Sequence, residues 1–128
     1  MAKAPSILVV DDDPQMRALL LEVLRDDGYD LVEANDGTEA VLALRARKFD
    51  VIIMDKNMPG PSGLDLLPGL RRVCPGTQII MMTAFGDVAS YMEAVEKGAV
   101  EYLFKPFRME EMKGAIAKAL GRVVPCQK

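Results

Sequence analysis

Short, almost wholly apolar runs alternate along the chain with longer segments in which apolar residues recur every three or four positions. The runs predict strands and the spaced patterns predict helices, because a strand inside a parallel sheet is buried on both faces, whereas a helix buries one face only. The predicted strands are residues 6–10, 30–34, 51–54, 78–82 and 101–104. The chain thus reads as a series of strand–helix units.

Capping and turn residues set the limits of the predicted helices. Asp13 followed by Pro14 suits a helix start, and this first helix ends near Gly28. Asp36 suits the start of the second helix for the same reason. The spacing assigns to the buried face of the first helix Met16, Leu19, Leu20, Val23 and Leu24. The other helices are expected near residues 64–73, 87–98 and 109–120.

Alternating strands and helices predict an α/β domain with a parallel sheet covered by helices on both faces. No linker, internal repeat or low-complexity stretch interrupts the alternation. A chain of 128 residues suits one such domain. We expect this domain to occupy residues 1–122, with residues 123–128 forming a C-terminal tail or the start of a linker.

The charge and composition exclude several classes of function. The net charge is −3 and the Lys and Arg residues are scattered, so we expect neither nucleic-acid nor membrane binding. No apolar run is long enough to span a bilayer, and no apolar leader precedes the first strand, which favours the cytoplasm. The chain has no histidine, so any histidine in its mechanism must come from a partner.

Acidic residues follow two of the predicted strands. Asp11 and Asp12 end the first apolar run, and Asp55 ends the third. Ligands of open α/β sheets bind beyond the carboxyl ends of the strands, so these carboxylates can meet at one site. Crowded carboxylates recruit a cation, and Mg²⁺ accepts carboxylate, water and phosphate oxygens. We assign Asp13 to helix capping instead. The cluster is a candidate site of phosphoryl transfer.

Thr83 follows the fourth predicted strand and Lys105 follows the fifth. Either residue alone is more often a turn hydroxyl or a surface charge. Together with the acids they provide what phosphoryl transfer needs, because a carboxylate can act as nucleophile while a hydroxyl and an ammonium take up charge on the phosphoryl oxygens.

Two other functions fit parts of this pattern. A metal-dependent phosphohydrolase of the haloacid dehalogenase kind would use Asp11 as its nucleophile, but Gln15 stands where that motif has threonine, and no cap domain is present. A flavodoxin-like cofactor binder would hold phosphate in the loop after the first strand. The acidic loop at residues 11–13 opposes that function.

The complete set of motifs resembles the receiver domain of bacterial two-component response regulators, over residues 6–120. The resemblance implies a flavodoxin-like, doubly wound (βα)5 fold with a five-stranded parallel sheet in the order 2-1-3-4-5. The motifs are Leu8-Val9-Val10-Asp11-Asp12, Asp55-Lys56-Asn57-Met58-Pro59 with Gly63, Met82-Thr83-Ala84 and Lys105-Pro106-Phe107.

The resemblance also implies a role for each site residue. Asp55 would accept a phosphoryl group from a sensor histidine kinase or a histidine phosphotransfer protein. Mg²⁺ would be held by Asp11, Asp12, Asp55 and the main-chain carbonyl of Asn57. Thr83 and Lys105 would contact the phosphoryl oxygens. The domain would not be an enzyme, beyond promoting its own phosphorylation and dephosphorylation.

A conformational switch is implied as well. Thr83 and Tyr102 would couple phosphorylation to a surface made by the fourth helix, the fifth strand and the fifth helix. Through that surface the domain would control an output domain or effector, or form a homodimer. The peptide bond before Pro106 is expected to be cis. The remaining alternative is a receiver-like module that binds partners without phosphorylation.

Overall fold

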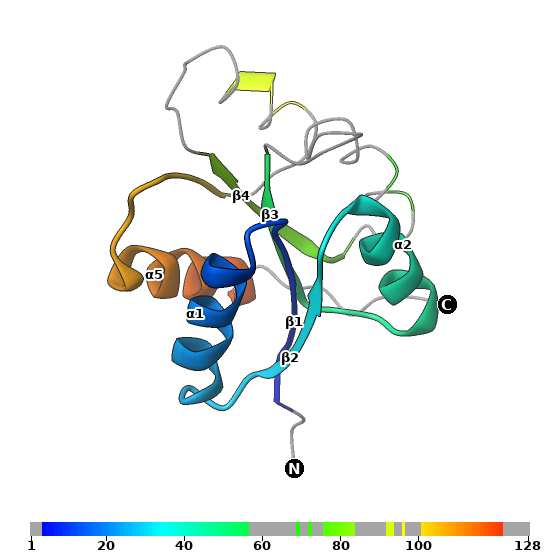
Figure 1. The fold of residues 1–128 in the computed structure, drawn as a ribbon, viewed down its shortest axis with the longest axis horizontal. Helices are drawn as coiled ribbons and strands as arrows, with labels where there is room; N and C mark the ends of the chain where they lie inside the picture. Colours follow the sequence, from blue (N-terminus) through cyan, green and yellow to red (C-terminus); the bar gives the residue numbers. More distant parts are fainter. Residues whose placement is uncertain are drawn as a thin grey trace.

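The computed structural model describes residues 4–56, 69, 72, 76–83, 92–93, 96 and 101–121. Its elements are β1 Ser6–Val10, α1 Pro14–Arg25, β2 Asp30–Ala34, α2 Gly37–Ala46, β3 Val51–Asp55, β4 Gln78–Thr83, β5 Glu101–Phe104 and α5 Met109–Leu120. The strands form one parallel sheet in the order β2-β1-β3-β4-β5 (Figure 1). The predicted fold and strand order are confirmed.

Some predicted segments lie mainly outside the described residues. Of the helices expected near residues 64–73 and 87–98, only positions 69, 72, 92, 93 and 96 are described, and all are helical. The predicted tail at residues 123–128 lies outside them entirely. None of the helices in the described ranges has the length and apolar character that crossing a bilayer would demand.

Helices cover both faces of the sheet. α1 and α5 lie on one face, and α2 lies on the other (Figure 1). Side chains alternate along β1, so Leu8 and Val10 pack in the core beneath α2, whereas Ile7 and Val9 pack in the core beneath α1 and α5. The central strands β3 and β4 are buried along their whole length, which explains their continuous apolar runs.

The buried face of α1 overlaps most of the predicted face, because Leu20 and Leu24 are buried and Met16 packs against the same core. Leu20, Leu21 and Leu24 are buried, whereas Leu19 is 46% exposed. Residues 17, 20, 21 and 24 share one side of a helix, so the first member of the buried stripe is Arg17. A charged residue therefore begins the face that α1 turns toward the sheet.

Asp36 caps α2, as predicted. Its Oδ1 accepts a hydrogen bond from the N–H of Glu39 at 2.9 Å. Asp36→Ala should lower the free energy of unfolding by about 1 kcal/mol, because the first turn of α2 loses that acceptor. Urea denaturation measures this change. Asp36→Asn, which keeps a side-chain acceptor, should stay close to wild type; an alanine variant as stable as wild type would contradict the assignment.

Candidate functional site

Three carboxylates meet at the carboxyl edge of the sheet. Asp11 and Asp12 follow β1, and Asp55 is the last residue of β3. The strands are neighbours with Val10 opposite Met54, which places the acids side by side. One carboxylate oxygen from each acid lies within 4.8 Å of the others. Asp11 is fully buried, Asp55 is nearly so and Asp12 is partly exposed.

Lys105 reaches the acids from the end of β5. Its Nζ lies 3.4 Å from Oδ2 of Asp11 and 3.4 Å from Oδ2 of Asp55, and its side chain is 19% exposed. The N–H of Lys105 donates to the carbonyl of Thr83 at 2.6 Å, which ties the segment to the end of β4. The Lys105–Pro106 peptide bond is cis, as expected.

Thr83 and Tyr102 lie close to this edge. Thr83 is fully buried and follows Met82, the residue paired with Asp55 across β3 and β4. Tyr102 is buried in the core beneath α2, and its ring packs edge to face with Phe104 at a centroid distance of 5.2 Å. Asn57, whose carbonyl was expected to bind the metal, lies outside the described residues.

The donor set suits a hard divalent cation. Like-charged oxygens at this separation repel by about 3 kcal/mol per pair at an effective dielectric constant of about 20. Lys105 pairs with two of the three carboxylates, those of Asp11 and Asp55. The three acids lie in a largely buried place, where a divalent cation would offset their repulsion. Oxygen ligands of this kind match Mg²⁺.

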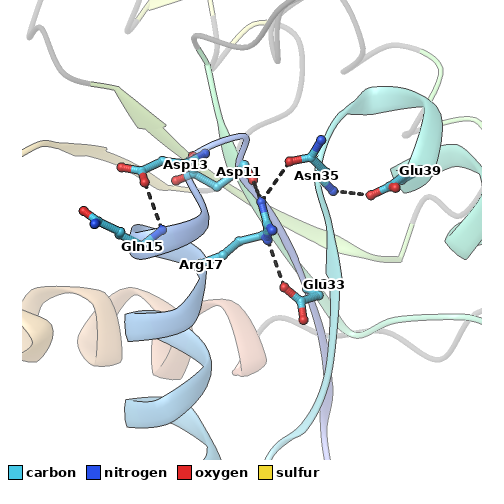
Figure 2. A network of polar contacts seen from close by, with 7 residues as sticks. All are labelled: Asp11, Asp13, Gln15, Arg17, Glu33, Asn35 and Glu39. Carbon is cyan, nitrogen blue, oxygen red and sulfur yellow. Dashed lines mark hydrogen bonds and ion pairs between the residues drawn. The ribbon is translucent and has the colours of Figure 1, made fainter.

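The position of Asp11 is set by several contacts. Its N–H donates to the carbonyl of Ala34 at 3.2 Å, and its Oδ1 accepts from the N–H of Asp13 at 2.9 Å. Asp13 points its own carboxylate at the helix start, where Oδ1 accepts from the N–H of Gln15 at 3.0 Å (Figure 2). Asp13 thus caps α1, as predicted, and is not part of the acid cluster.

Arg17 is a residue of this region that the sequence reasoning missed. Its Nη1 donates to the carbonyl of Asp11 at 2.6 Å and to Oδ1 of Asn35 at 3.0 Å, and its Nε donates to Oε1 of Glu33 at 2.9 Å (Figure 2). The side chain is 16% exposed. One feature of the sequence could have revealed it. Arg17 stands three positions before Leu20 and four before Leu21, so a helix places this charged residue on the same side as the buried leucines.

Comparisons with known proteins agree with this geometry. The model of the response regulator receiver domain matches residues 7–117. The DNA-binding response regulator MtrA of Mycolicibacterium smegmatis is 37% identical over 116 residues, which cover 91% of this chain and 50% of that protein. The transcriptional regulatory protein TcrA of Mycobacterium tuberculosis is 36% identical over 119 residues, covering 93% and 47%. This chain thus spans about half the length of these curated relatives.

Solved structures show the same fold. A response regulator receiver domain protein from Clostridium thermocellum superposes with a TM-score of 0.86 at 32% identity, covering 92% of this chain and 95% of that chain. The response regulator TrrA from Thermotoga maritima, solved in complex with Mg²⁺-BeF, gives 0.82 at 36% identity, covering 91% and 99%. The chain therefore belongs to the family of response regulator receiver domains, which are signalling modules of two-component systems.

Proposed function

We propose that Asp55 accepts a phosphoryl group from a phosphohistidine of a sensor histidine kinase or a histidine phosphotransfer protein. The observation that carries this proposal is the convergence of Asp11, Asp12 and Lys105 on Asp55, at the end of a fully buried strand. The partner must supply the histidine, because this chain has none. A carboxylate oxygen of Asp55 forms the bond to phosphorus while the donor's P–N bond breaks, and the ring nitrogen keeps the electron pair.

Asp11, Asp12 and Asp55, with the main-chain carbonyl of Asn57, would hold Mg²⁺. The fit rests on the closeness of three carboxylate oxygen donors. When bound, the ion supplies positive charge beside the phosphoryl oxygens. The relative TrrA, solved in complex with Mg²⁺-BeF, supports this assignment by similarity.

Lys105 and Thr83 would stabilise the phosphorylated side chain. Phosphorylation of Asp55 adds negative charge beside an ammonium that already lies 3.4 Å from its carboxylate. The buried hydroxyl of Thr83 follows the residue paired with Asp55 and can bond a second phosphoryl oxygen. Thr83 belongs to β4 and the N–H of Lys105 donates to its carbonyl, so both groups are already placed and little reorganisation is needed.

The output would pass through the outer strand of the sheet. Thr83 lies opposite Phe104 in the register of β4 and β5, and Phe104 packs against the ring of Tyr102. A change at Thr83 therefore reaches Tyr102 through neighbouring residues. The surface expected from β5, α5 and the predicted helix near residues 87–98 would contact an output domain, an effector or a second copy of the chain. The domain itself, over residues 1–122, would not bind nucleic acid.

Intact-mass analysis after incubation with acetyl phosphate tests the proposal. We expect the gain of one phosphoryl group in the presence of Mg²⁺ and none when the ion is chelated, because the acids need a cation before a phosphate can approach. Peptide mapping should place the group on Asp55. A group on Asp11 would favour the phosphohydrolase, and no gain under either condition would favour a module that binds without phosphorylation.

A further inference from the structure

We propose that Arg17 is a positioning residue that holds the Asp11–Asp12 segment in a geometry ready for a divalent cation. The inference rests on the proposed function, in that the acid cluster must bind Mg²⁺. Arg17 itself touches none of the cluster's carboxylates in the contacts described for it. Its effect would come through the main chain of Asp11, which carries one carboxylate and leads into the next.

The guanidinium joins three parts of the molecule. From α1 it reaches the carbonyl of Asp11 at the end of β1 and the side chains of Glu33 and Asn35 at the end of β2 (Figure 2). Asn35 is held in turn, because its N–H donates to the carboxylate of Glu39 in the first turn of α2. We call Arg17, Glu33 and Asn35 the arginine clamp. It connects the acidic segment to both the sheet and α2.

The clamp completes the restraint of Asp11. The N–H of Asp11 is bound to Ala34, Oδ1 is bound to Asp13 and Oδ2 is paired with Lys105. The carbonyl is the remaining main-chain group, and Arg17 binds it at 2.6 Å. Mutual repulsion of the acids pushes this segment away from Asp55. A segment already held in place loses less conformational freedom when the ion binds, and this raises the affinity.

Only an arginine can make this set of contacts. Nε and Nη1 point to different acceptors on two strands, and the planar fork fixes both directions together. A lysine keeps the positive charge but offers a single nitrogen, so it cannot hold the Asp11 carbonyl and Glu33 in this geometry. Arg17→Lys therefore separates the effect of geometry from the effect of charge.

Charge and geometry predict changes of opposite sign in the affinity for Mg²⁺. If Arg17 acted through its charge alone, its removal would make the site more negative and strengthen Mg²⁺ binding. If Arg17 acts by positioning, its removal weakens binding. Loss of a residue that orients metal ligands commonly costs about 10–100-fold in affinity. The direction of the change therefore distinguishes the two roles.

Calorimetric titration of Mg²⁺ into folded protein tests the proposal. Arg17→Gln and Arg17→Lys should both bind Mg²⁺ about 10–100-fold more weakly than wild type, with unchanged circular dichroism. Arg25→Gln is the matched control, because it removes the same charge from the last turn of the same helix. This control should bind like wild type. Equal or tighter binding by Arg17→Gln would overturn the inference.

A second variant keeps the test decisive if the Arg17 variants fail to fold. The variant Asn35→Ala removes one acceptor of the clamp from an exposed position, leaves the net charge unchanged and retains Arg17. It should also weaken Mg²⁺ binding, and wild-type affinity in this variant would contradict the clamp. Failure of the wild-type protein to bind Mg²⁺ would instead reject the proposed function, and this outcome is distinct from either result on the clamp.

Discussion

Asp55→Asn is expected to abolish the Mg²⁺-dependent gain of a phosphoryl group from acetyl phosphate. The amide has nearly the shape of the carboxylate but lacks its negative charge, so it is neither a nucleophile nor a good ligand for a hard cation. Asp55 ends the central strand of the sheet with 5% exposure, and the isosteric change leaves the packing intact. Intact-mass analysis under the conditions used for wild type measures the loss directly.

The matched control for this variant is Asp50→Asn. Asp50 precedes β3 at the opposite edge of the sheet, where its Oδ2 accepts from the N–H of Ser6 at 2.9 Å. The asparagine can still accept that bond, so this control removes one negative charge without touching the acid cluster. It should be phosphorylated like wild type. A phosphoryl group that persists in Asp55→Asn would reject Asp55 as the acceptor, and peptide mapping would identify the true site.

Lys105→Met should lower the stability of the Mg²⁺-free protein by about 2–3 kcal/mol. The substitution keeps most of the side-chain volume but removes the ammonium that lies 3.4 Å from two buried carboxylates. Breaking a fully buried ion pair from one side costs about 3–5 kcal/mol. The expected loss is smaller, because the Lys105 side chain is 19% exposed. Urea denaturation with the metal chelated gives the free energy of unfolding.

Two measurements isolate the cause of that loss. Lys113→Met removes an ammonium at the same 3.4 Å distance from Asp27, but both partners of that pair are much more exposed, so its cost should be about 0–1 kcal/mol. Adding Mg²⁺ should recover more stability in Lys105→Met than in wild type, because the ion replaces the missing positive charge. Equal losses in the two lysine variants would contradict a role for Lys105 in neutralising the acids.

The predicted strands agree closely with the structure because central parallel strands are apolar on both faces. The sequence limits of β1, β2 and β5 match the observed ones, and β3 and β4 each extend one residue further, to Asp55 and Thr83. Those two extra residues are two of the polar groups of the site. The strand order followed from the family resemblance and the structure confirms it. Periodicity and capping also located α1, α2 and α5.

Short-range patterns in the sequence determined where the strands lie, which residues end them, and hence that Asp11, Asp12, Asp55, Thr83 and Lys105 share one edge. Tertiary packing alone decided where the buried face of α1 ends. Leu19 was predicted to be buried and is exposed, whereas Leu21 and most of Arg17 are buried, because acceptors at two strand ends satisfy the guanidinium of Arg17. Those acceptors are distant along the chain, so no local pattern predicts the arginine clamp.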